Sequence, residues 1–161
     1  MSGDVNLRLA EESDIPAILG IAQTFVAESA YGYTYSQARS ESIITAYLSD
    51  PYHAVVVAEG EQGLAGIRGL DGIWIGAIVH EWTNEPICYL AKFYVMPWAR
   101  GKGVAKLLRD SFVRWADDNG CLDIFVTSTA NIGAGPAFEK LFRGVGFVDC
   151  GQTLMRRKPR Q

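Results

Sequence analysis

Residues 87–106 read ICYLAKFYVMPWARGKGVAK, and this stretch decides the fold. Its first part, Ile87 to Val95, is rich in β-branched and aromatic residues, which predicts a long strand that ends before Pro97. Residues 100–105 (Arg-Gly-Lys-Gly-Val-Ala) then open a predicted helix that runs to about Asn119. A strand that passes through a glycine-rich turn into a helix leaves several backbone N–H groups unpaired and pointing the same way. Because the helix dipole adds positive potential, such a turn is suited to bind a phosphate or pyrophosphate.

The residues of this turn favour an anion further. Gly101 and Gly103 allow the backbone to approach phosphate oxygens closely, and Arg100 and Lys102 add positive charge. Two other glycine-loop motifs do not fit. The nucleoside-triphosphate loop needs a Lys followed by Ser or Thr, and that pattern is absent. The dinucleotide fingerprint needs a third Gly or Ala, and Lys106 stands at that position. It also needs an acidic residue at the end of the next strand, whereas Asp123 lies near the start of that strand.

The rest of the chain predicts alternating helices and strands in one domain that spans residues 1–161. No internal repeat or low-complexity linker divides it. The segment 59–72 holds five glycines and predicts a loop or an irregular hairpin. In chain order we predict a strand at 6–9, helices at 13–28 and from 36 to 50, strands at 54–58, 73–82 and 87–95, a helix from 104 to 119, a strand at 122–128, a helix at 136–142 and a terminal hairpin of 146–150 with 153–155.

Composition excludes several classes of protein. The net charge of −3 and the pI near 5.4 argue against a general nucleic-acid binder. The longest apolar stretch, 73–79, is far shorter than the roughly 20 residues of a membrane span, and the acidic N-terminal region holds no signal-peptide core. The three cysteines, Cys88, Cys121 and Cys150, lack metal-ligand or redox spacing. We therefore expect no metal, and we interpret the cysteines as reduced, small apolar core residues of a cytoplasmic protein.

At this point a family resemblance becomes specific. The pattern Arg100-x-x-Gly103-x-Ala105, directly after Tyr94-Val95-Met-Pro97, resembles the acetyl-CoA pyrophosphate motif of the GNAT (Gcn5-related) N-acetyltransferase superfamily. The element order and the ending from Phe138 to Gly146-Phe147 are similar to that family as well. The resemblance implies an α/β (α+β) fold with a mixed, mostly antiparallel sheet of six to seven strands. It further implies about four flanking helices and splayed central strands.

The resemblance also implies a cofactor site for acetyl-CoA. In the family, backbone amides of the glycine turn hold the pyrophosphate, and the edge of the preceding strand pairs with pantetheine. The Val95 amide would then face the thioester oxygen as an oxyanion donor. Family members often carry an Asn after the next strand that contacts the cofactor, and Asn131 stands at this place. The alternative interpretation is that Asn131 only forms a turn. The implied cofactor-binding residues are Phe93, Tyr94, Val95, Arg100, Gly101, Lys102, Gly103, Val104, Ala105, Lys106 and Asn131.

The sequence departs from the family at both of its usual proton-transfer positions. The family often carries a Glu base on the long strand, in some branches followed by an Asp, and these positions hold Ala91 and Lys92. The frequent general acid, a Tyr, falls on Phe142, which has no hydroxyl group. Catalysis remains feasible, because a thiol with a pKa near 8.5 can leave as a thiolate beside a helix N-terminus.

Substitute catalytic groups have to come from elsewhere, so the catalytic residues stay unassigned. The weak candidates are Tyr94, Tyr31 and Glu81. Nearby residues of the acceptor side in relatives are Glu28, Tyr33, Tyr35 and His80. Loop packing, strand capping and core packing are the alternative explanations for these side chains.

The sequence therefore predicts an enzyme that transfers an acetyl group from acetyl-CoA to a primary amine, by direct attack within a ternary complex. The alternative is a non-catalytic acyl-CoA-binding or regulatory module on the same fold, which the residues at positions 91 and 142 motivate. We expect acetyl-CoA and an amine-bearing acceptor as partners, and neither nucleic acid nor membrane. Relatives commonly pair as dimers, so a homodimer is a further expectation.

Overall fold

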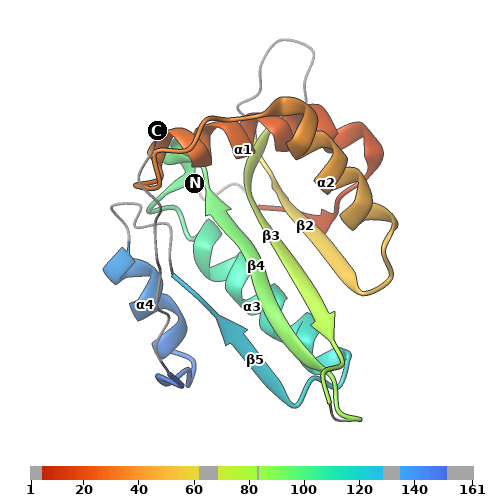
Figure 1. Cartoon of the computed structure of the whole chain (residues 1–161). Helices are drawn as coiled ribbons and strands as arrows, with labels where there is room; N and C mark the ends of the chain where they lie inside the picture. The colour runs from red at the N-terminus through yellow and green to blue at the C-terminus, as the bar shows by residue number, and fades with distance from the viewer. Residues whose placement is uncertain (1–4, 62–68, 83, 129–134, 152–161) are drawn as a thin grey trace, which may run out of the picture.

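The computed structural model describes residues 5–61, 69–82, 84–128 and 135–151 (Figure 1). A central sheet lies between two layers of helices. Helices α1 and α2 cover one face, whereas α3 and α4 cover the other. The elements in chain order are β1 (Leu7–Leu9), η1 (Glu12–Asp14), α1 (Ile15–Glu28), α2 (Gln37–Ser49), β2 (His53–Glu59), β3 (Leu70–Val79), β4 (Ile87–Val95), η2 (Pro97–Ala99), α3 (Val104–Asp118), β5 (Asp123–Val126) and α4 (Gly135–Arg143).

The sheet is mixed, as predicted. Its strands lie in the order β1-β2-β3-β4-β5, and the first three neighbouring pairs are antiparallel. The pair β4–β5 is parallel, because α3 crosses over the sheet between the two strands. The described part of the chain holds five strands, where we predicted six to seven.

The predicted terminal hairpin is wrong in its first half. Residues 147–150 form no strand, and 153–155 lie outside the described residues. Gly146, at φ +98°, instead belongs to the turn that ends α4, where the N–H of Phe147 donates to the carbonyl of Phe142 at 3.4 Å. The Phe147 ring packs edge-on against Phe142, with 5.2 Å between the ring centroids. The apolar residue after the glycine therefore closes a helix end, a role that alternation in sequence cannot distinguish from a strand.

Each face of the sheet carries its own apolar core. Strand β2 is buried on both faces, as its unbroken apolar sequence predicts. Under α3, the fully buried Trp74 packs against Phe112 and donates its indole N–H to Ser111 at 2.6 Å. Burial of a large side chain of this kind stabilises the fold by about 1.5–3 kcal/mol. These contacts fix α3, and with it the glycine turn at its N-terminus, against β3 and β4.

Candidate functional site

The glycine turn presents unpaired backbone donors at the start of α3. Gly101 and Gly103 have φ values of +77° and +86°, in the region where residues with a Cβ are strained. Among the described residues, the N–H groups of Gly101, Gly103, Val104 and Ala105 find no acceptor. The N–H groups of Lys102 and Lys106 donate to Ala99 and Gly103, at 3.4 and 3.1 Å. Four N–H groups at the start of α3 thus have no acceptor among the described residues.

Space for a ligand lies next to these donors. Apart from its neighbours in the chain, a Cβ built on either Gly101 or Gly103 would meet no atom of the described residues within 4 Å. The glycines are therefore required by their backbone conformation, and no described residue fills the volume beside them. The side chains of Lys102 and Lys106 are exposed at the same turn and add positive charge.

Strands β4 and β5 pair along only part of their length. The ladder begins at Ile87 with Asp123 and ends at Leu90 with Val126. Beyond it, β4 continues as residues 91–95 with β3 on one side and no described strand on the other. The splayed strands implied by the family resemblance are present in this form, and Figure 1 shows the two strands diverging toward the start of α3.

The register fixes which backbone groups face this open side. The N–H of Met96 donates to the carbonyl of Asp71 at 2.8 Å, so Gly72 and Val95 form a non-hydrogen-bonded pair of the antiparallel ladder. In such a pair the N–H and C=O groups of each residue point away from the partner strand. Val95 therefore directs its N–H and C=O groups to the open edge, and Phe93, two residues earlier, does the same.

A β-bulge interrupts β4 at the position where the family often carries its base. Lys92 pairs with Ile75 and Leu90 with Gly76, so Ala91 is an extra residue without a partner in β3. The side chain of Lys92 is exposed, and its Nζ lies 3.1 Å from the carbonyl oxygen of Ala91. The bulge thus re-aims the strand without supplying a carboxylate.

Three side chains from three elements meet beside the turn. Tyr94 of β4 donates its hydroxyl hydrogen bond to Glu28 Oε2 at 2.6 Å, and Arg100 of the turn binds the same oxygen at 2.6 Å. Arg100 also reaches the Tyr94 hydroxyl at 3.1 Å, lies over the Tyr94 ring at 5.4 Å, and donates from Nε to the carbonyl of Val95 at 3.1 Å. The last residue of α1 is thereby joined to the end of β4 and to the turn.

The ionisation of this group follows from its contacts. Burial alone would raise the pKa of Glu28, but hydrogen bonds from Arg100 and Tyr94 and the Arg100 charge lower it overall. Burial, together with the hydrogen bond to Glu28 and its charge, raises the pKa of Tyr94. Glu28 is therefore a carboxylate at neutral pH, and Tyr94 keeps its proton.

The predicted catalytic candidates have different surroundings in the structure. Tyr94 lies at the site, with its hydroxyl proton committed to Glu28. Tyr31 stacks on Tyr33, with 5.1 Å between ring centroids. Glu81 follows β3 and accepts a hydrogen bond from Tyr89 at 3.2 Å, at the end of the hairpin opposite to the turn. The β4 strand between these ends is about 26 Å long.

Two further predicted positions have different outcomes. Asn131 lies outside the described residues. Phe142 is 3% exposed and packs in an aromatic cluster with Phe93, Phe138 and Phe147 that docks α4 on the sheet. The ring at position 142 is therefore a core residue.

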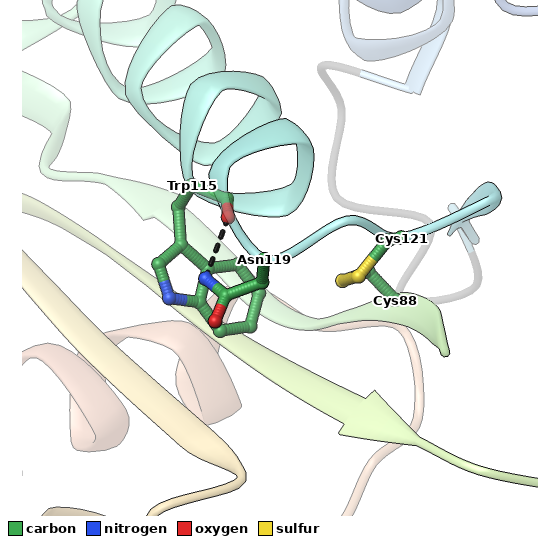
Figure 2. The surroundings of a disulfide bond; sticks show 4 residues. All are labelled: Cys88, Trp115, Asn119 and Cys121. Carbon is green, nitrogen blue, oxygen red and sulfur yellow. Dashed lines mark hydrogen bonds between the residues drawn. A yellow bond between two sulfur atoms is a disulfide. The ribbon is translucent and has the colours of Figure 1, made fainter. Parts of the chain in front are cut away.

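The prediction of three reduced cysteines is wrong. Cys88, at the start of β4, forms a disulfide with Cys121, which lies two residues before the first residue of β5 (Figure 2). The Cα atoms are 5.9 Å apart although 33 residues separate the cysteines in sequence. At the end of α3, Asn119 donates from its side chain to the carbonyl of Trp115 at 2.7 Å, and the chain then turns back to β4.

The spacing of the cysteines in the sequence could not reveal this disulfide, because it is the parallel pairing of β4 with β5 that brings Cys88 and Cys121 together. Cys88 is fully buried, as expected of a core residue, whereas Cys150 is a free and exposed thiol. The disulfide joins the two strands where they pair, at the far end from the point where they part.

In the described ranges of the chain, no group of three or more His, Cys, Asp or Glu side chains is arranged to hold a metal ion. None of the helices described is both long and apolar enough to cross a bilayer.

Comparison with known proteins assigns the family. The sequence profile of the Acetyltransferase (GNAT) family matches residues 22–144. The chain belongs to the GNAT family. The uncharacterized N-acetyltransferase YjgM of Escherichia coli K12 is 31% identical over 159 residues, which covers 89% of each chain. The aminoglycoside N(6')-acetyltransferase type 1 of Salmonella typhimurium is 29% identical over 117 residues, covering 63% of this chain and 78% of the relative.

Solved GNAT structures share the fold along nearly the whole chain. The aminoglycoside acetyltransferase AAC(6')-Iy, in complex with the bisubstrate analogue CoA-S-monomethyl-acetylneamine, superposes with a TM-score of 0.73 at 18% identity and covers 98% of this chain and 100% of its own. A ribosomal-protein-alanine N-acetyltransferase from Brucella melitensis gives 0.71 at 17% identity, covering 96% and 99%. As a GNAT enzyme, the chain is an N-acetyltransferase with acetyl-CoA as its acetyl donor.

Proposed function

We propose that this enzyme transfers the acetyl group directly to a primary amine within a ternary complex, on the open edge of β4. The observation that carries the proposal is the continuity of two binding features. The outward N–H and C=O groups of Phe93 and Val95 lead into the unpaired N–H groups at the start of α3. An extended arm that carries amides and a diphosphate at one end fits both features at once.

Each part of acetyl-CoA is assigned to residues of this chain. The amides of Gly101, Gly103, Val104 and Ala105 are the proposed pyrophosphate donors, supported by their lack of an acceptor among the described residues. The side chains of Lys102 and Lys106 would contribute charge there. Phe93 and Val95 would pair with the pantetheine amides as an added strand does.

The chemistry then needs little from ionisable side chains. The neutral amine nitrogen attacks the thioester carbonyl carbon, the C–S bond breaks, coenzyme A leaves as a thiolate, and the nitrogen loses its proton to solvent. The Val95 N–H, directed to the open edge, would donate to the thioester oxygen as charge develops on it, which is worth about 3 kcal/mol in comparable sites. Orientation of the two reactants can supply roughly 7–11 kcal/mol more.

The absence of a carboxylate at Ala91 predicts a specific pH dependence. With solvent as the proton acceptor, kcat/KM for the amine rises with pH in proportion to the fraction of neutral amine. A plateau well below the pKa of the amine would contradict this, because it would reveal an enzymatic base.

Turnover with a panel of amines tests the function. The panel begins with aminoglycosides such as neamine, because a relative is named for acting on aminoglycosides and a neighbouring structure holds an acetylneamine analogue. A diamine, an amino acid and a peptide N-terminus follow. We expect acetylated product and stoichiometric coenzyme A by mass spectrometry for at least one amine. Detection by mass is preferable to a thiol reagent, because such a reagent would also react with the exposed thiol of Cys150. Micromolar binding of coenzyme A without turnover of any amine would contradict the proposal.

A further inference from the structure

The C-terminal residue of α1 holds the turn and the end of β4 in one fixed arrangement. Glu28 uses a single oxygen, Oε2, for both Arg100 and Tyr94. The Glu28 side chain is 29% exposed and that of Arg100 38%, so the contact lies at the rim of the site. It joins residues 72 positions apart in sequence.

Arg100 transmits this contact to the reacting edge. One guanidinium nitrogen binds Glu28, while Nε donates to the carbonyl oxygen of Val95 at 3.1 Å. That carbonyl belongs to the residue whose N–H faces the open edge. On its inner side the same strand end is held by the bond from the Met96 N–H to the carbonyl of Asp71. Arg100 is therefore the described side chain that restrains Val95 from the outside.

We propose that Glu28 is a positioning residue, which acts through Arg100 to hold Val95 with its N–H aimed at the thioester oxygen. This inference rests on the proposed function. Glu28 touches neither reactant in this role. Its contribution is to keep the long, flexible Arg100 side chain in the one rotamer that reaches the Val95 carbonyl.

Charge makes the arrangement specific to a carboxylate. An ionised Glu28 holds the guanidinium with a charge-assisted hydrogen bond, which is about twice as strong as a neutral one. Without that charge, Arg100 is free to turn toward the phosphates of the cofactor, a few residues along the same turn. The amide of a Gln keeps the size of the side chain and removes the charge, so Glu28→Gln isolates the effect.

A double-mutant cycle tests the proposal, with neamine or the best amine of the panel as acceptor. The variants are Glu28→Gln, Arg100→Met and the double variant, and Glu41→Gln is the control because it removes one exposed carboxylate from α2. We expect Glu28→Gln to lower kcat about tenfold while the KM for acetyl-CoA changes less than about threefold, since misplacement of a reacting group affects kcat most directly. In the Arg100→Met background the same change should have no further effect.

Other outcomes would overturn the proposal. Additive losses in the cycle would show that Glu28 acts independently of Arg100, and a change confined to the KM of the amine would make Glu28 an acceptor-binding residue. A lower melting temperature with unchanged kcat would make its role purely structural.

Hydrogen exchange separates this inference from the proposed function. If the wild-type enzyme acetylates no amine, the proposed function fails, and exchange of the segment 93–99 still tests the positioning role. Glu28→Gln should raise exchange there at least threefold and leave the α3 segment 108–116 unchanged. Equal exchange in both proteins would contradict the positioning role.

Discussion

Each end of α1 carries a carboxylate that binds an arginine, and the two carboxylate–arginine pairs have different roles. At its start, Asp14 binds the Arg8 guanidinium of β1 through both carboxylate oxygens, at 2.7 and 2.8 Å, and accepts the N–H of Glu11. Arg8 continues to Glu59 of β2 at 2.6 Å. At its other end, Glu28 holds Arg100 through one oxygen. One carboxylate is 2% exposed and the other 29%.

The difference in burial decides what each pair can do. Hydrogen bonds to Asp14 and Glu59 raise the pKa of Arg8, and the hydrogen bond to Glu28 raises the pKa of Arg100, so both arginines stay charged. Removal of a buried, hydrogen-bonded carboxylate strongly destabilises the folded state, because the groups that it bound lose a partner away from water. A half-exposed pair contributes little to stability because water screens it. The first pair stabilises the fold, whereas the second contributes little to stability and restrains the end of β4 through the Val95 carbonyl.

The largest expected effect is at the buried end of the helix. Asp14→Ala removes one of the two carboxylates that bind Arg8, together with the acceptor of the Glu11 N–H, and should lower the free energy of unfolding by roughly 3–5 kcal/mol. Glu28→Ala should cost less than about 1 kcal/mol. Urea unfolding of both variants measures the contrast, and equal losses would refute the distinction between the two ends.

Reduction of the disulfide measures the effect on stability of a restraint that lies away from the glycine turn, at the start of β4. Opening the Cys88–Cys121 bond, which spans 33 residues, should cost about 3–4 kcal/mol through the entropy of the unfolded chain. Affinity for coenzyme A should change less than about twofold in the folded fraction. Unfolding with and without reductant gives the first value and calorimetry the second, with Cys150→Ser as the control. Identical stability in both conditions would show that the bond does not constrain the chain.

The two ends of α3 allow the effect of backbone strain to be separated from an effect on ligand binding. A glycine with positive φ lies at each end, Gly103 before the helix and Gly120 after it. Gly103→Ala and Gly120→Ala both place a Cβ at positive φ, +86° and +68°, with no atom within 4 Å. Each should destabilise the fold by about 1–2 kcal/mol. Only Gly103→Ala should also weaken coenzyme A binding, by about tenfold, because its Cβ enters the space beside the anion donors. Titration calorimetry checks this, and equal affinities in the two variants would argue against the assigned pyrophosphate site.

The smallest effect is a pH dependence at the exposed end of the helix. The pKa of Glu28 is lowered in the folded state, so its stabilising contribution is complete above the unfolded value of about 4.3 and is lost as pH falls through the folded pKa. The difference in unfolding free energy between wild type and Glu28→Gln should stay constant from pH 7 to 5 and shrink below about pH 4. A difference that grows on acidification would reverse the assigned sign.

Local signals predicted much of the molecule from sequence. The bounds of β4, Ile87–Val95, were predicted to the residue, because the strand lies between Pro86 and Pro97. The predicted start of α2 at residue 36 is confirmed, where the Ser36 hydroxyl accepts the N–H of Arg39 at 3.4 Å. The turn of Gly101 and Gly103 was likewise readable from residue type. These features depend on neighbours in the chain, which is why periodicity and turn chemistry identify them.

Contacts between distant segments could not be predicted in the same way. Glu28 was a candidate among several acidic and aromatic residues of the acceptor side, and nothing in its local sequence indicates Arg100 as its partner. The same holds for Cys88 and Cys121, whose proximity depends on the register of a parallel strand pair. Such pairs need the topology of the sheet before residue spacing carries information.

The outer side of β4 between residues 91 and 95 has one further consequence. No described strand pairs with this side of β4, and an edge without a partner strand is a template on which an extended segment can add, including the same edge of a second molecule. The exposed ammonium of Lys92 lies along this edge and opposes such an addition by charge repulsion. We therefore expect the ligand-free protein to aggregate on storage more readily than the coenzyme-bound form, and replacement of Lys92 by Thr to widen that gap.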